Sequence, residues 1–290
     1  MGGDGWMTAT DDTRESVGGK EPAERAVPAP RGAPDGEGRA DGASGPRRVL
    51  ITGGSSGIGA ATARAFAARG FPVAVAGRDA VELKEVAADT GGIALPGDLR
   101  DQGVPQATVE AAADALGGLD VVVSNAGIGW AGPFAAMTED EIDALLDVNL
   151  RAAAHLTRAS LRHLRPGRGH LVFVGSIAGV VGVAGEAWYS ATKAGLAALA
   201  EVLRAELRGE DIGVTVVTPG VVDTPYFERR NVPYQRNYPR PVSAQLVADL
   251  IVDAVIRRRD EVVVPGWLML PARLKGSFPR LYRLLESRFA

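Results

Sequence analysis

From position 47 onward, short apolar segments alternate with longer segments of helical periodicity, and this alternation restricts the fold more than any other feature. The apolar segments carry Val, Ile and Leu at consecutive positions, which is typical of strands buried on both faces of a parallel sheet. Right-handed crossovers between such strands give a doubly wound sheet. We therefore predict an α/β domain with a parallel, seven-stranded sheet and helices on both faces.

The element boundaries follow from the same pattern. The predicted strands are 49–51, 71–76, 93–95, 119–123, 170–174, 214–217 and 262–264. The predicted helices are 60–69, 81–89, 104–116, 139–164, 188–207, 245–256 and 278–289. Residues 47–265 form the predicted catalytic domain, and 266–290 form a C-terminal extension.

The segment 1–46 has a different composition. It contains ten Gly, five Pro and a net charge of −4, with few large apolar residues. Such a segment buries too little surface to offset the entropy lost on ordering. We predict a disordered tail and read no function from it.

Composition excludes several functional classes. The chain has no Cys, so thiol chemistry and disulfides are absent, and no His or carboxylate pattern indicates a metal site. The remainder after the tail has almost no net charge, which argues against nucleic acid as a partner. No run approaches the roughly 18 apolar residues of a membrane span, and no signal pattern opens the chain. A cytoplasmic location is expected.

A glycine-rich turn, Thr52 to Gly59, lies between the first strand and the first helix. Gly53 permits a tight turn, Gly57 lets backbone approach a pyrophosphate, and Gly59 lets the helix pack on the strand. The helix N-terminus then offers N–H groups to phosphates, with Ser55 and Ile58 beside them. The turn predicts a Rossmann-like dinucleotide site.

Cofactor choice is read at the end of the second strand, beside the adenine ribose. An acidic residue there binds the 2′-hydroxyl of NAD, whereas an Arg accommodates the 2′-phosphate of NADP. The strand is followed by Gly77, Arg78 and Asp79. We predict NADP(H) bound through Arg78; NAD remains the alternative, with Arg78 a solvated turn residue and Asp79 a helix cap.

Tyr189 and Lys193 lie four residues apart in a predicted helix, so their side chains share one face. A nearby ammonium favours the phenolate and lowers a tyrosine pKa. We therefore predict that Tyr189 exchanges a proton with a substrate oxygen near neutral pH. Only four of the 32 basic residues are Lys, so a surface cation here would more often be Arg.

The chain resembles the short-chain dehydrogenase/reductase family, in its compact single-domain branch. The resemblance covers about 47–265 and rests on motifs in the family's order and spacing, which are Thr52-Gly-x-x-x-Gly-x-Gly59, Asn125-Ala126-Gly127, Asn149, Ser176, Tyr189-x-x-x-Lys193 and Pro219-Gly220. Ser124 stands where the family often has a second Asn.

The resemblance implies a role for each matching residue. Tyr189 would be the general acid or base, Lys193 would lower its pKa and bind the nicotinamide ribose, and Ser176 would polarise the substrate oxygen. Asn149 would anchor a water that links Lys193 to solvent. The remaining implied cofactor contacts are Asp98 and Leu99 at the adenine, Asn125, Ala126 and Gly127 at the adenosine, and Pro219, Gly220, Val222 and Thr224 at the carboxamide.

The substrate is expected to be a hydrophobic small-molecule ketone or alcohol. An apolar loop at 177–183 follows Ser176, and Ile128, Trp130 and Trp188 are close in sequence to site residues. The segment 226–242 combines Tyr and Phe with four Arg and is predicted to be a substrate lid or a partner surface. Two other functions remain open, which are a cofactor-binding regulatory protein without turnover and a membrane-peripheral protein with secondary redox activity.

The C-terminal extension carries five basic residues and one acidic residue, with Leu281, Leu284, Leu285 and Phe289 on one helical face. Such a helix packs on its own domain or on a neighbouring subunit, or it lies weakly on a membrane surface through 267–290. The resemblance also implies a homodimer or homotetramer that pairs through the helices 139–164 and 188–207.

Overall fold

The computed structural model describes residues 45–289 except 231, 233 and 235–238. The predicted tail therefore lies outside the described residues apart from its last two positions, and so do Arg236 and Tyr238 of the predicted lid. None of the described helices is long and apolar enough to cross a membrane.

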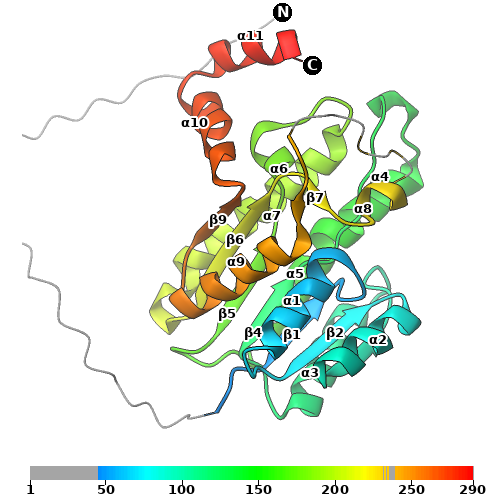
Figure 1. The fold of residues 1–290 in the computed structure, drawn as a ribbon, viewed down its shortest axis with the longest axis vertical. Coiled ribbons are helices and arrows are strands. Elements are labelled where there is room, and N and C mark those ends of the chain that lie inside the picture. Colours follow the sequence, from blue (N-terminus) through cyan, green and yellow to red (C-terminus); the bar gives the residue numbers. More distant parts are fainter. Residues whose placement is uncertain (1–44, 231, 233, 235–238, 290) are drawn as a thin grey trace, which may run out of the picture. The chain divides into compact units, whose positions relative to one another are not determined.

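Seven parallel strands form one sheet in the order β3-β2-β1-β4-β5-β6-β9 (Figure 1). The strands are β1 Val49–Thr52, β2 Val73–Gly77, β3 Ile93–Pro96, β4 Val121–Ser124, β5 His170–Val174, β6 Gly213–Pro219 and β9 Glu261–Val264. The order reverses between β1 and β4, so the predicted doubly wound sheet is confirmed. Two further two-residue strands, β7 Val222–Asp223 and β8 Val242–Ser243, pair with each other beyond the sheet.

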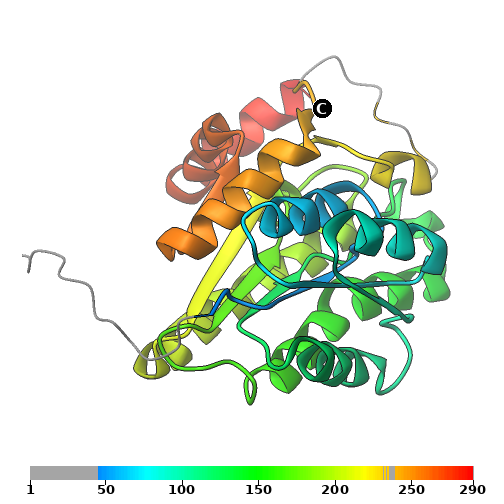
Figure 2. The same cartoon turned by 60° about the horizontal axis from the view of Figure 1, so that its bottom comes forward.

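Helices cover both faces of the sheet (Figures 1 and 2). One core lies under α1 Gly57–Ala67, α2 Ala80–Thr90 and α9 Ala244–Arg257. The other lies under α3 Val104–Leu116, α5 Ala152–Ser160 and α7 Ala187–Glu206. Successive strand residues alternate between the two cores, as Val49 and Leu50 do. This two-sided burial explains why the strands read as continuous apolar runs.

The predicted helix 139–164 is divided and shorter than expected. α4 Glu139–Leu146 begins with a capping box at Thr138, then one π-helical turn, η2 Asp147–Arg151, leads into α5. The helix ends at Ser160, and turn residues follow it before Pro166. Asn149 lies within this π turn. Helical periodicity alone does not single it out as a site residue.

Short elements at the carboxyl edge were not predicted. The segment 177–183, expected as a loop, contains α6 Ile177–Val181, and the predicted lid begins with α8 Tyr226–Arg229. After β9, η4 Gly266–Leu268 leads into α10 Met269–Ser277, and α11 Pro279–Phe289 matches the predicted C-terminal helix. The remaining short helices are η1 Phe134–Ala136 and η3 Leu207–Glu210.

Candidate active site

A cavity of about 1230 Å³ lies at the carboxyl edge of the sheet. All the sequence-predicted site residues line it except Gly59 and Asn149, which lie behind its wall. The lining combines the glycine-rich turn with Ser176, Tyr189 and Lys193. Because the strands are parallel, their carboxyl ends meet at this edge, so the fold gathers residues that lie far apart in sequence.

The glycine-rich turn has the shape of a phosphate cradle. Gly53 and Gly57 adopt positive φ angles of 63° and 54°, which L side chains rarely take. A Cβ added to Gly59 would lie 2.1 Å from the carbonyl oxygen of Gly53, so no side chain fits there. Helix α1 has no acidic residue in its first turn and no side-chain cap at Ser56. Its first N–H groups are therefore available to an anion.

Asn125 fixes the glycine-rich turn to the end of β4. Its Nδ2 donates to the carbonyl oxygens of Thr52 and Gly53, at 2.9 and 3.1 Å. The buried Thr52 hydroxyl accepts from the backbone N–H groups of Asn125 and Ala126 and lies 3.3 Å from the Val123 oxygen, to which it donates. A Cβ on Gly53 would contact Ala126 at 2.8 Å. These contacts hold β1, β4 and the turn in one arrangement.

The far end of the cavity carries opposite charges. Arg78 is exposed and makes no hydrogen bond or ion pair within the described residues. Asp98 pairs with Arg100 at 2.6 Å, and this hydrogen bond, with a smaller effect from Arg78, holds the Asp98 pKa below its usual range. Asp79 caps α2 through the N–H groups of Val81 and Glu82. Arg78 is thus an unpaired cation at the mouth of the cavity.

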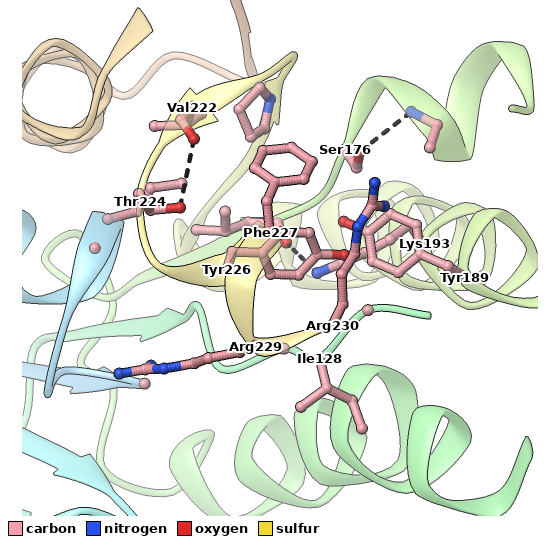
Figure 3. Close-up of a pocket in the computed structure, with 18 of the residues that line it drawn as sticks. Ile128, Ser176, Tyr189, Lys193, Val222, Thr224, Tyr226, Phe227, Arg229 and Arg230 are labelled. Atoms are coloured by element: carbon pink, nitrogen blue, oxygen red, sulfur yellow. Dashed lines mark hydrogen bonds between the residues drawn. The ribbon is translucent and has the colours of Figure 1, made fainter. Parts of the chain in front are cut away.

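Tyr189, Lys193 and Ser176 converge in the interior of the cavity (Figure 3). The side chains of Tyr189 and Lys193 share one face of α7, and the Lys193 nitrogen lies 5.9 Å from the centroid of the Tyr189 ring. Lys193 Nζ donates to the Val174 carbonyl oxygen at 2.9 Å. Ser176 caps α6 by accepting from the Ala178 N–H at 3.2 Å. The cap fixes the Ser176 hydroxyl beside the Tyr189 phenol.

The predicted direction of the Tyr189 pKa shift is wrong for this structure. Burial raises the pKa of Tyr189, and the hydroxyls of Tyr226 and Ser176 offset only part of that effect. Burial also lowers the pKa of Lys193 to about 8. Both shifts arise because a closed, apolar pocket disfavours charge. Tyr189 therefore holds its proton at neutral pH in the structure without ligand.

Asn149 is buried in the π turn and joins three elements. Its Oδ1 accepts from the Ile128 N–H at 2.9 Å, while Nδ2 donates to the Ile128 oxygen and the Thr192 hydroxyl, at 3.0 and 3.1 Å. A Cβ on Gly127 would lie 3.2 Å from Lys193 Nζ and 3.3 Å from Asn149 Oδ1. The glycine therefore leaves a narrow space between those two polar atoms.

The segment after β6 closes the cavity on the side opposite Tyr189. The Thr224 hydroxyl donates to the Val222 oxygen at 3.4 Å, and a Cβ on Gly57 would contact Thr224 at 3.1 Å. Gly220 donates its N–H to the Val264 oxygen at 2.7 Å. Thr224 therefore lies against the glycine-rich turn, and Pro219, Gly220 and Val222 line the cavity beside it.

Helix α8 lines the cavity, and two arginines at its C-terminal end, Arg229 and Arg230, fix its position. Arg230 forms an ion pair with Glu186 at 2.5 Å, with 7% and 16% of the side chains exposed, and stacks on the Phe227 ring at 4.7 Å. Arg229 extends the other way (Figure 3), donating to the Ser56 hydroxyl at 2.7 Å and pairing with Glu82 at 3.3 Å. The predicted lid is thus tied to both the catalytic helix and the glycine-rich turn.

Tyr226 contributes a second phenol to the cavity. Its ring centroid lies 6.0 Å from that of Tyr189. Its hydroxyl is buried, has no hydrogen-bond partner of acceptable geometry within the described residues, and lies against Gly129, where a Cβ would be 2.1 Å from it. Burial raises the Tyr226 pKa, so this phenol is neutral.

The sequence analysis missed some of the residues that line the cavity, and some residues that it placed near the substrate lie outside the cavity lining. Glu186 was missed, although its position three residues before Tyr189 could have drawn attention to it. Trp267, Leu268 and Pro271 show that the C-terminal extension borders the cavity. Trp130 and Trp188 pack behind Tyr189, where the Trp188 N–H donates to the Ile142 oxygen at 2.8 Å. The described residues contain no cluster of side chains that could hold a metal ion.

The chain has clear counterparts among known proteins. The family model described as short chain dehydrogenase matches residues 47–234. An uncharacterized oxidoreductase of Myxococcus xanthus is 35% identical over 241 residues, which cover 80% of this chain and 93% of that protein.

Two solved structures are similar across most of their length. A short chain dehydrogenase from Burkholderia cenocepacia in complex with NADP is 34% identical, with a TM-score of 0.69 over 75% of this chain and 95% of that one. A short-chain dehydrogenase from Sphingobium yanoikuyae in complex with NADPH is 30% identical, with a TM-score of 0.70 over 81% and 96%. With its parallel sheet, its glycine-rich turn and these matches, the chain belongs to the short-chain dehydrogenase family of oxidoreductases.

Proposed function

We propose that this protein is an NADP(H)-dependent oxidoreductase that interconverts a carbonyl and a secondary alcohol on a hydrophobic small molecule. One observation supports this most strongly. Tyr189, Lys193 and Ser176 line the same cavity as the glycine-rich turn, so a proton donor faces the space that a dinucleotide would fill. The two solved relatives that hold NADP or NADPH agree with this cofactor.

The residues of the cavity fit such a cofactor. Gly53, Gly57 and the N-terminus of α1 offer room and N–H groups for a pyrophosphate. Asp98 and Leu99 would border the adenine, and the residues Asn125 to Gly127 the adenosine. Pro219 to Thr224 would hold the carboxamide. The bound nicotinamide supplies hydride to the substrate carbon, or takes it up in the reverse direction.

Tyr189 acts as the proton donor in carbonyl reduction. Its phenol is protonated at neutral pH, because burial raises its pKa, and it donates that proton to the carbonyl oxygen as the carbon is reduced. The Ser176 hydroxyl donates a hydrogen bond to the same oxygen and stabilises its developing negative charge. In alcohol oxidation the proton moves in the reverse direction, and Tyr189 accepts the alcohol proton as a base after passing its own proton towards Lys193.

Lys193 and Asn149 return a proton to Tyr189. With a pKa of about 8, Lys193 is mostly protonated at neutral pH and still able to exchange its proton. The space left by Gly127 lies between Lys193 Nζ and Asn149 Oδ1, and Oδ1 keeps one lone pair beyond its bond to Ile128. A water held there would link Lys193 to solvent.

Replacing Arg78 with Ala is expected to raise the dissociation constant for NADPH at least about tenfold and that for NADH less than about threefold. Arg78 has no hydrogen-bond or ion-pair partner to release among the residues that the structure describes. A charge-assisted hydrogen bond to a phosphate contributes about 1.5–3 kcal/mol. Fluorescence titration with both cofactors measures the two constants. An unchanged preference would contradict the assignment.

Arg229→Ala provides the matched comparison. Arg229 reaches Ser56 in the turn that faces the pyrophosphate, and both cofactors carry that group. We therefore expect Arg229→Ala to weaken NADPH and NADH by a similar factor. A selective loss of NADPH binding would instead assign Arg229 to the 2′-phosphate.

The expected substrate is apolar. Beyond Ser176 and Tyr189 the cavity is lined mainly by Ile128, Ile177, Val181, Val183, Tyr226 and Phe227. Pockets of this composition take ligands with few polar groups and fix their orientation through a small number of hydrogen bonds. The ion pair between Arg230 and Glu186 holds α8 over this space and gives it the role of a cover.

A screen of hydrophobic ketones with NADPH, and of the matching secondary alcohols with NADP, tests the proposed reaction through nicotinamide absorbance. We expect turnover for some ketones and a shift towards alcohol oxidation at higher pH, because oxidation of the alcohol releases a proton. If the protein binds the cofactor but turns over none of these compounds, the alternative of a cofactor-binding regulatory protein would be favoured.

The assembly is proposed to be a homodimer or homotetramer. The outward face of α7 carries exposed Ala residues at 191, 194, 198 and 205, beside the exposed Val202, and Ala154 on α5 is also exposed. Small residues let helices from two subunits approach closely.

A further inference from the structure

We propose that α10 and α11 form a docking surface for an anionic lipid bilayer, which places the cavity beside the membrane surface. The segment that leads into this surface, from Leu268 to Lys275, is held on the domain. Leu268 is buried and lies against Gly220, and Lys275 Nζ donates to the Val180 oxygen at 2.9 Å. Helices α10 and α11 follow β9 and extend beyond the sheet (Figure 1).

Several large apolar side chains of this surface face solvent and do not pack on the chain's own domain. Leu270 and Phe278 are 68% and 62% exposed, and Leu281 and Leu285 are 46% and 36% exposed. Helix α10 has no buried residue. Leu281 and Leu285 stand four positions apart and share a face of α11. The alternative in which this helix covers its own domain is therefore not what the structure shows.

The charge of the surface selects its partner. The segment 266–290 carries five basic residues and one acidic residue. Arg273, Arg280 and Arg283 make no ion pair with the side chains that the structure describes, which end at Leu285. A second copy docked through the same face would bring these like charges together, whereas an anionic bilayer pairs with them. Exposed Leu and Phe beside unpaired Arg are the pattern of helices that lie in a membrane interface.

The surface is continuous with the cavity. Trp267 and Pro271, at the start of the extension, line the active site. A bilayer against α10 and α11 would therefore lie next to the entrance used by an apolar substrate. This part rests on the proposed function, and it names the substrate class as carbonyl compounds or alcohols dissolved in lipid.

Vesicle sedimentation tests the surface without depending on turnover. The full-length protein is mixed with phosphatidylcholine vesicles, with or without 30 mol% phosphatidylglycerol as the probe of anionic lipid. We expect at least a tenfold higher partition coefficient on the anionic vesicles, and a decrease as salt rises. Equal partition on both vesicles, or none on either, would overturn the proposal.

Two variants and a matched control locate the surface. Leu281→Glu with Leu285→Glu, and separately Arg280→Glu with Arg283→Glu, should each lower the partition at least tenfold. Ile256→Glu changes an equally exposed apolar residue on α9 and should leave it unaltered. NADPH binding, measured alongside, reports that each variant is folded. If both double variants partition like the wild type, the assignment is refuted. If the protein instead forms oligomers without lipid, and only the Leu281→Glu, Leu285→Glu variant loses them, the surface binds a second copy of the chain and not a bilayer.

Discussion

Replacing Tyr189 with Phe is expected to lower turnover at least about 100-fold, the usual contribution of general acid–base catalysis, while NADPH binding stays close to that of the wild type. The substitution removes only the hydroxyl. The ring keeps its packing with Leu145 and Ala178 behind the cavity. Steady-state rates with any ketone found in the screen, together with a fluorescence titration of NADPH, measure the two effects.

Tyr226→Phe is the appropriate control for this variant. Both phenols are buried, neutral and about 6.0 Å apart by ring centroid, but only Tyr189 shares a helix face with Lys193 and lies beside the Ser176 hydroxyl. We expect Tyr226→Phe to lose much less activity than Tyr189→Phe. Wild-type turnover in Tyr189→Phe, or the larger loss in Tyr226→Phe, would reassign the proton donor.

Acid is expected to destabilise the folded protein steeply below about pH 6.5 because of His170, which is buried far from the active site. Its Nε2 lies 2.7 Å from the Thr215 hydroxyl, which itself donates to the Arg259 oxygen at 2.5 Å. Nε2 must therefore be the donor, which leaves Nδ1 without a proton. Within the described residues Nδ1 has no partner, so a proton added there would find no acceptor.

The sign of the effect follows from the two protonation states. Burial, with the charges of Arg258 and Arg47, lowers the pKa of His170 to about 3, against 6.5 for the unfolded residue. Between these values the unfolded chain binds a proton that the folded chain does not. The free energy of unfolding therefore falls by about 1.4 kcal/mol for each pH unit below 6.5. The contribution is fully present above pH 6.5 and is lost towards pH 3.

Urea unfolding at a series of pH values between 7 and 4.5 measures this slope. In His170→Gln the slope should flatten, whatever the absolute stability of that variant. His163→Gln changes a more exposed histidine beside Glu110 and should keep the wild-type slope. If His170→Gln and the wild type show the same slope, the buried histidine is not the cause.

The sheet and the shared helix face of Tyr189 and Lys193 were predictable because their signals are local and strong. Seven apolar runs gave the strands, and the four-residue spacing of Tyr189 and Lys193 gave a shared helix face that the structure contains. Helix α8 was missed because four residues are too few to show a helical period. The ion pair between Glu186 and Arg230 joins positions 44 residues apart, and no local pattern reports it.

The Tyr189 pKa shows a different limit. Spacing correctly predicted a cation near the phenol, but the direction of the shift depends on how deeply both groups are buried. Tyr189 is only 8% exposed and Lys193 5%. The Lys193 ammonium donates its hydrogen bond to the Val174 oxygen and not to the phenol. The cost of burying a phenolate therefore exceeds the stabilisation by this cation, and the Tyr189 pKa rises. Burial of that kind is set by packing from several distant segments.

The crossed order of the sheet also affects how the chain is made. β1 needs β2 on one side and β4 on the other, yet β4 begins about seventy residues after β1 ends. At a translation rate of about 5–20 residues per second, that interval lasts about 4–14 seconds. Throughout it the nascent chain exposes an apolar strand with one unpaired edge at the ribosome, which is the kind of segment that chaperones bind.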